Sequence, residues 1–225
     1  MVFITGTDTG VGKTLMTALV LTFNRLKVPD TLACKPFCSG SRSDVHIIEA
    51  VMDGEFSRAQ INPFYYSAPL APLIAARLGK GPQVKLSDCL RHLKQLKKNC
   101  RLLVVEGAGG LMVPLGESFS LLDLIIETRS KSLLVAPNRL GVINAILLNI
   151  SVMKNSRAKN PIIFLMNQKK GDISARFNTL AVKSLLPDYK VFRIPYLGAD
   201  PEVPAHLKKA LKKIRKTLAK VSEEL

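Results

Sequence analysis

The chain has 225 residues, of which 47% are apolar and 22% are charged, a balance that excludes disorder over most of its length. No run of about 18 uninterrupted apolar residues is present, so the sequence predicts no membrane-spanning helix. The formal net charge of +16 suits anionic ligands, nucleic acid or another anionic surface. The N-terminus lacks the features of a secretion signal, so we expect a cytoplasmic protein with four reduced cysteines.

Apolar runs alternate with amphipathic segments along the chain. The runs predict strands at residues 2–5, 31–35, 102–106, 132–136, 162–166 and 191–194. The amphipathic segments predict helices at residues 13–26, 44–52, 73–78, 88–98 (with Ser87 as N-cap), 120–128, 142–153, 174–185 and 204–225. Residues 62–72, rich in proline and aromatic residues, are expected to form a loop.

Strands that are apolar along their whole length are typical of a parallel sheet buried on both faces. Their alternation with helices predicts right-handed crossovers, and no repeat or linker divides the chain. We therefore expect one doubly wound α/β domain over residues 1–225. It has a mostly parallel central sheet flanked by helices, and it binds ligands at the carboxyl ends of the strands.

A glycine-rich segment, residues 5–14, reads TGTDTGVGKT between the first expected strand and helix. Its glycines allow backbone N–H groups to face a phosphate at a helix N-terminus. Lys13 is expected to reach the β- and γ-phosphates, and the Thr14 hydroxyl to bind Mg²⁺. Five residues separate Gly6 from Gly12, against four in the common motif, so this is a longer variant. The segment predicts a P-loop NTPase-like fold.

Two acidic residues are candidate metal ligands. Glu106 ends the most apolar strand and precedes three small residues and a glycine, so its carboxylate can face the phosphate loop or lie on the surface. Asp44 follows the polar loop after the second strand and is either a metal ligand or a helix N-cap. Lys35, at the end of that strand, is a further candidate, with a surface lysine as the alternative.

The sequence distinguishes between classes of phosphate-loop protein. Residues 167–170 read NQKK and fail the Asn-Lys-x-Asp guanine motif at both the lysine and the aspartate. Residues 7–11 lack the early lysine of partitioning and cell-division ATPases. A partitioning-type ATPase that binds DNA through its basic surface stays an alternative, although we do not expect nucleic acid to be a partner.

Several blocks in order resemble the dethiobiotin synthetase family. They span nearly the whole chain. The blocks are the phosphate loop, residues 35–40 (KPFCSG) with Ser43-Asp44, residues 62–64 (NPF), 106–110 (EGAGG) with Pro114-Leu115, 140–144 (LGVIN) and 194–197 (IPYL).

The resemblance implies a reaction of MgATP, CO₂ and 7,8-diaminononanoate in biotin biosynthesis. A carbamate on one amine is phosphorylated, and the second amine then attacks to give dethiobiotin, ADP and phosphate. Lys13 and Lys35 would be catalytic, since they offset the repulsion between carbamate and γ-phosphate. Thr14, Asp44 and Glu106 would hold Mg²⁺. A related synthetase with another substrate is a further alternative.

The resemblance also implies the binding residues. The expected nucleotide-binding residues are Gly10, Val11, Gly12, Lys13, Thr14, Leu15, Asp44, Glu106, Gly107, Ala108, Gly109, Asn167, Gln168, Pro195, Tyr196, Leu197 and Glu202. The expected substrate-binding residues are Thr9, Ser39, Leu140, Gly141 and Asn144. The last three would lie at the interface of a homodimer and contact the substrate carboxylate of the neighbouring subunit.

Three features depart from the family pattern. Gln168 replaces an acid found in some relatives, and Pro72-Leu73 stands where Pro-His is common. The C-terminal helix at residues 204–225 carries seven lysines and arginines. Its apolar residues recur at 4-3-4-3 spacing, a stripe that packs on the core or pairs with another helix. These residues are Leu207, Leu211, Ile214, Leu218 and Val221.

Overall fold

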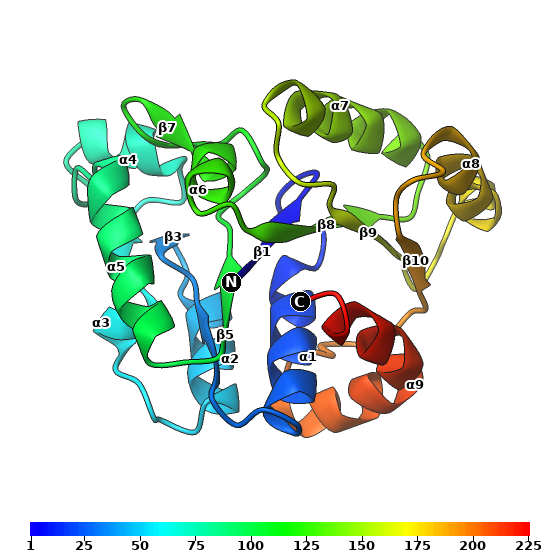
Figure 1. The fold of residues 1–225 in the computed structure, drawn as a ribbon, viewed down its shortest axis with the longest axis horizontal. Helices are drawn as coiled ribbons and strands as arrows, with labels where there is room; N and C mark the ends of the chain where they lie inside the picture. Colours follow the sequence, from blue (N-terminus) through cyan, green and yellow to red (C-terminus); the bar gives the residue numbers. More distant parts are fainter.

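The computed structural model describes residues 1–225 and is built on a six-stranded sheet (Figure 1). All pairings within this sheet are parallel, in the order β10-β9-β8-β1-β5-β2. Its strands are β1 (Val2–Gly6), β2 (Thr31–Cys34), β5 (Leu102–Glu106), β8 (Lys131–Pro137), β9 (Ile162–Met166) and β10 (Val191–Ile194). The predicted doubly wound parallel sheet is confirmed.

Helices cover both faces of the sheet, with α1 and α9 on one side and α7 and α8 on the other (Figure 1). None of them combines the length and apolar character needed to cross a membrane. The helices are α1 (Lys13–Arg25), α2 (Ser43–Val51), α3 (Arg58–Ile61), α4 (Pro72–Arg77), α5 (Leu86–Lys98), α6 (Leu121–Glu127), α7 (Val142–Asn155), α8 (Asn178–Leu185) and α9 (Pro204–Ser222).

Two small sheets were not expected. Strand β3 (Phe37–Ser39) pairs in parallel with β4 (Phe64–Tyr66), which falls within the predicted loop. Strands β6 (Pro114–Gly116) and β7 (Phe119–Ser120) pair antiparallel. Segments of two or three residues are too short to show a periodicity of two. The Phe37 ring packs against Phe64, Tyr66 and Phe119, so this aromatic contact holds the small sheets together.

Two helix predictions need correction. Helix α5 begins at Leu86, so Ser87 is not its N-cap; the Asp88 carboxylate instead accepts a hydrogen bond from the Lys85 N–H. The expected helix at 174–185 is divided into a 3₁₀ turn (Ile173–Arg176) and α8. Asp172 caps that turn by accepting from the Ser174 N–H, and this local bond favours the tighter turn.

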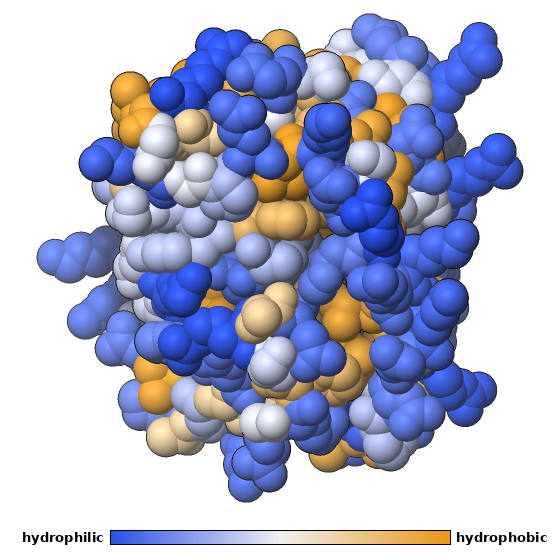
Figure 2. Space-filling view, turned by 90° about the vertical axis from the view of Figure 1, so that its left-hand side faces the viewer, coloured by the Kyte–Doolittle hydropathy of each residue, from blue (hydrophilic) through white to orange (hydrophobic).

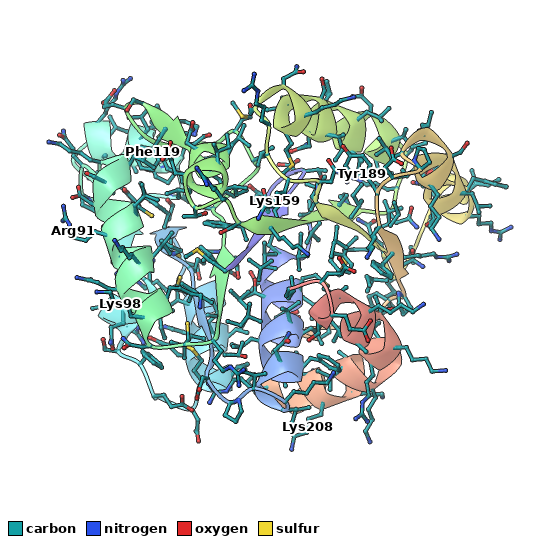
Figure 3. All side chains as sticks on the ribbon, in the orientation of Figure 1. Arg91, Lys98, Phe119, Lys159, Tyr189 and Lys208 are labelled. Atoms are coloured by element: carbon teal, nitrogen blue, oxygen red, sulfur yellow. The ribbon has the colours of Figure 1, made fainter.

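The C-terminal helix α9 packs its apolar stripe on the core, mainly against α1. The Ser222 hydroxyl donates to Asn24 at the end of α1 (2.7 Å), and the helix is kinked at Ile214. Its lysines and arginines are all exposed, as Lys208 shows (Figure 3). The stripe therefore serves intramolecular packing, and the charge lies on the solvent side.

A second basic group lies on α5, whose Arg91 and Lys98 project outward (Figure 3). Hydrophilic residues dominate the side of the molecule that carries α4 and α5, with smaller apolar patches between them (Figure 2). The high net charge is thus spread over separated helix faces.

We expect Leu218→Ala to lower the free energy of unfolding by about 2–5 kcal/mol, because it removes a fully buried side chain between α9 and the core. Denaturant unfolding measures this change. Lys220→Ala on the exposed face of the same helix is the matched control and should change stability by less than about 0.5 kcal/mol. Equal effects would contradict the packing role of the stripe.

Candidate active site

A cavity of about 630 Å³ opens at the carboxyl ends of the parallel strands. It is bounded by the phosphate loop, the ends of β2, β5 and β9, the start of α2, and the segment after β10. The lining residues are Thr9, Gly10, Val11, Gly12, Lys13, Thr14, Leu15, Lys35, Ser43, Asp44, Ile47, Glu106, Gly109, Pro137, Met166, Asn167, Gln168, Lys169, Pro195, Tyr196, Leu197, Gly198, Pro201 and Glu202.

The phosphate loop has a conformation that requires glycine at two positions. Gly10 (φ +71°) and Gly12 (φ +100°) lie in the left-handed region, which side chains with a Cβ rarely adopt. Gly12 is also the N-cap of α1, and no side chain caps this helix end. The first backbone N–H groups of α1 are therefore available to a ligand, and the helix dipole favours an anion there.

Lys13 is 94% buried beside this loop, its Nζ donating to the Asp8 carbonyl oxygen (2.8 Å). Burial lowers the pKa of Lys13 to about 8, although the nearby Glu106 carboxylate opposes this shift. The ammonium is held by a neutral carbonyl and has no direct carboxylate partner. An incoming phosphate would supply the missing counter-charge.

Lys35 lies at the centre of a buried polar cluster and is not a surface lysine. Its Nζ donates to Glu106 Oε1 (2.6 Å) and also pairs with Asp44. The Thr14 hydroxyl donates to the same Glu106 oxygen (2.8 Å). Burial alone would lower the pKa of Lys35, but the carboxylates of Glu106 and Asp44 raise it above its ordinary value. Lys35 is therefore charged at any physiological pH.

The structure also excludes the alternative roles of Glu106 as a surface residue and of Asp44 as a helix N-cap. Glu106 is 1% exposed, so it is not a surface residue. Asp44 is the second residue of α2, whose N-cap is Arg42, so it does not cap the helix. Glu106 lies beside the phosphate loop because β5 pairs with β1, and Asp44 joins the same cluster by pairing with Lys35, which follows β2.

The residues around Lys35 fit a magnesium ion. Thr14, Asp44 and Glu106 offer only oxygen ligands, and Glu106 Oε2 is buried without a hydrogen-bond partner in the protein. The structure contains no cluster of three or more His, Cys, Asp or Glu side chains that could hold a metal without other ligands. Magnesium is commonly held by one or two carboxylates together with phosphate oxygens and water, so this smaller donor set suits it.

The far end of the cavity is lined by the segments that follow β9 and β10. The side-chain amides of Asn138 and Asn167 lie 2.7 Å apart, which fixes Asn167 at the end of β9. Lys213 of α9 donates to the Tyr196 carbonyl oxygen (3.4 Å). Glu202 and Lys169 complete this end. The structure thus brings the predicted nucleotide-binding residues after β9 and β10 to the same cavity as Lys13 and Lys35.

A second cavity of about 450 Å³ shares Thr9 with the first. Its walls are largely apolar and come from the phosphate loop, the segment after Gly109 and one face of α7. The lining residues are Thr7, Asp8, Thr9, Gly110, Leu111, Met112, Val113, Pro114, Leu148, Asn149 and Val152. Sequence reasoning identified only Thr9 here, although the position of residues 110–114 after a central strand end was a signal.

Other predicted residues lie outside the first cavity. Gly107 and Ala108 do not line it, and Gly107 packs against Leu121. Ser39 lies in β3, its hydroxyl buried without a hydrogen-bond partner. Three of the predicted substrate-binding residues lie at the start of α7 and line neither cavity. These are Leu140, Gly141 and Asn144.

Sequence reasoning also missed several residues of the first cavity. Ile47 lies one helical turn after Asp44, and the others lie next to predicted residues or at strand ends. For the two residues that end β8 and β9, that position is the only signal in the sequence. The missed residues are Ser43, Ile47, Pro137, Met166, Lys169, Gly198 and Pro201.

Comparison with known proteins agrees with this geometry. A family model described as "AAA domain" matches residues 1–206. The chain is 32% identical to the ATP-dependent dethiobiotin synthetase of Bacillus velezensis, over 89% of this chain and 86% of that protein. It is 33% identical to the enzyme of the same name from Thermodesulfovibrio yellowstonii, over 87% and 88%. The chain belongs to the dethiobiotin synthetase family.

Solved structures show the breadth of the fold. The cell division ATPase MinD of Pyrococcus furiosus superimposes with a TM-score of 0.55 at 14% identity, over 96% of this chain and 98% of that one. MinD of Aquifex aeolicus gives 0.53 at 14% identity, over 97% and 96%. At these identities the likeness concerns the fold alone. It confirms the predicted P-loop NTPase-like architecture.

We expect ATP binding at pH 8 to take up about half a proton through Lys13, whose pKa of about 8 leaves half of this side chain neutral. Bound phosphate favours the ammonium and raises its pKa. Calorimetric titration in HEPES and in Tris, which differ in ionisation enthalpy, measures this uptake. Lys13→Arg keeps the charge and should remove the uptake; an unchanged value in that variant would refute the assignment.

Proposed function

We propose that this protein is an ATP-dependent dethiobiotin synthetase that closes the cyclic urea of dethiobiotin from 7,8-diaminononanoate, CO₂ and ATP. The observation that carries the proposal is the convergence of Lys13, Lys35, Thr14 and Glu106 at a phosphate loop, in a chain of this family. Phosphorylating a carbamate brings two anions together, so a site for it needs fixed cations around the reacting oxygens.

The phosphate loop binds the nucleotide. Backbone N–H groups at the start of α1 and the Lys13 ammonium contact the phosphates, and the base lies toward Asn167, Gln168 and the segment after β10. In this cavity no acidic residue occupies the position that a guanine motif requires, which is consistent with use of ATP. Glu202 is the acid at this end, and it lies on the segment before α9.

Thr14, Asp44 and Glu106 would hold Mg²⁺ through oxygen atoms. The ion would neutralise charge on the phosphate oxygens during transfer. Lys35 shares the carboxylates of this set and lines the same cavity, so its ammonium is within reach of the acceptor. We assign it the role of stabilising the carbamate and the transferred phosphoryl group.

The second cavity is suited to the diamine. Its apolar side chains match a chain of methylene groups, and Thr9 lies where the two cavities meet. In this arrangement the amines would lie near the γ-phosphate and the aliphatic chain along α7. Ser39, whose buried hydroxyl has no partner in the protein, is available to bind the amine or carbamate.

We further propose a homodimer formed through α7. Leu140, Leu147 and Leu148 on and before this helix are exposed large apolar residues, and Met112 across the second cavity is exposed as well. Burying them against a second copy would remove apolar surface from water and close the second cavity. The residues at the start of α7 would then reach the substrate of the neighbouring subunit.

The assay that tests the activity measures phosphate release from MgATP and bicarbonate with and without 7,8-diaminononanoate, followed by mass spectrometry of the product. Diamine-dependent release and a mass gain of one carbonyl bridge are expected. Lys35→Ala should lower kcat by about 100-fold or more with the fold intact, because it removes transition-state charge stabilisation. Diamine-independent hydrolysis in the unmodified protein would instead favour another acceptor or a different P-loop ATPase.

The dimer is tested by sedimentation. We expect Leu148→Glu to give monomers and to raise the KM for the diamine about tenfold or more, because a carboxylate would be buried against apolar groups. Leu180→Glu, on the exposed face of α8, is the control and should leave both measurements unchanged. A dimer that persists in Leu148→Glu would contradict the assigned interface.

A further inference from the structure

The Lys35 ammonium lies in the middle of the candidate magnesium ligands. It pairs with Asp44 and with Glu106 Oε1 at 2.6 Å, and Thr14 donates to the same Glu106 oxygen. Two of the three ligand groups therefore contact the ammonium directly, and Thr14 is linked to it through Glu106 Oε1. The contacts of Lys35 are those of a cation held by the metal site.

Burial strengthens the electrostatic interaction between Lys35 and the two carboxylates. The Glu106 side chain is fully buried and that of Lys35 is 7% exposed, whereas Asp44 is 38% exposed. A buried carboxylate is destabilised without a counter-charge, so Glu106 favours a cation beside it. Glu106 Oε1 already accepts two hydrogen bonds, which leaves this oxygen little capacity for a further ligand while Lys35 stays in place.

We propose that Lys35 is an internal counter-ion of the metal site, and that it must withdraw from Glu106 and Asp44 before a divalent cation binds there. This inference rests on the proposed function only in identifying the site as a metal site. Its consequence is an order of events: the free ion competes with a tethered ammonium and binds weakly, and the ion enters together with nucleotide.

Nucleotide changes the balance in two ways. Phosphate oxygens supply further ligands for the ion, which Mg²⁺ prefers to a site made only of protein. The γ-phosphate also offers the released ammonium a new anionic partner within the same cavity, and the flexible lysine stem allows the move. Lys35 thereby leaves the carboxylates of Glu106 and Asp44 and pairs with the reacting anions when the phosphoryl group is transferred.

Lys13 provides the matched control. It is a second buried lysine near Glu106, but its Nζ contacts the Asp8 carbonyl oxygen and neither carboxylate. Removing either lysine takes one positive charge from the neighbourhood of the site. Only the removal of Lys35 frees the Glu106 Oε1 and Asp44 Oδ2 atoms that the ammonium contacts, so the two variants separate a local contact from a general field effect.

The experiment is a titration of the free protein with Mn²⁺, followed by electron paramagnetic resonance, with neither nucleotide nor diamine present. Lys35→Met should bind Mn²⁺ at least about tenfold more tightly than the unmodified protein, while Lys13→Met should stay within about threefold of it. Adding Glu106→Gln to Lys35→Met should abolish the gained site.

Affinity in Lys35→Met equal to that of the unmodified protein would overturn the proposal, as would an equal gain in Lys13→Met. If Lys35→Met does not fold, Lys35→Gln keeps a hydrogen-bond donor without the charge and should show the same tighter binding. Thermal unfolding with Mn²⁺ provides a second measurement, because metal should raise the midpoint of the uncharged variants more than that of the unmodified protein. Failure of the synthetase assay leaves these results unaffected.

Discussion

The parallel pairing of β1 with both β5 and β8 is the constraint on which the site depends. Ile4 is in register with Glu106, so the carboxylate emerges one strand away from the phosphate loop that follows β1. On the other side of β5, β2 ends at Cys34 and delivers Lys35 to the same edge. Three strand ends thus bring together residues that are 71 and 92 positions apart.

That convergence has an electrostatic requirement. Glu106 is buried in the centre of the molecule, where an isolated carboxylate would be strongly destabilised. Lys35 and the Thr14 hydroxyl meet this requirement, and the cluster links α1, β2 and α2 to β5. The contacts that compensate the buried Glu106 charge are therefore the same ones that the proposed function uses for catalysis. A variant of Glu106 or of Lys35 would disturb both, whereas Lys13 contacts neither carboxylate.

The sequence predicted the parallel sheet and the phosphate loop because both depend on local patterns: continuous apolar runs and glycines before a helix. Family resemblance added Asn167 and Tyr196 to the expected nucleotide-binding residues and favoured Asp44 as a metal ligand, and all three line one cavity. The second cavity was not foreseen, since its walls come from the phosphate loop, residues 110–114 and α7, and no periodicity encodes their contact. The β3–β4 pair was missed for the same reason: its stability comes from the packing of Phe37 and not from a strand pattern.

The two lysines of the cavity show how position divides one residue type into two roles. Burial beside a neutral carbonyl lowers the pKa of Lys13, whereas two carboxylates raise that of Lys35. The charged fraction of Lys13 would therefore rise when an anion occupies the phosphate loop, so its electrostatic contribution would be coupled to occupancy. Lys35 carries its charge permanently and can only change partners. The proposed reaction, which needs a bound nucleotide and then a stabilised second anion, would use both behaviours. The positions of Lys13 after β1 and of Lys35 after β2 give the two lysines these different surroundings.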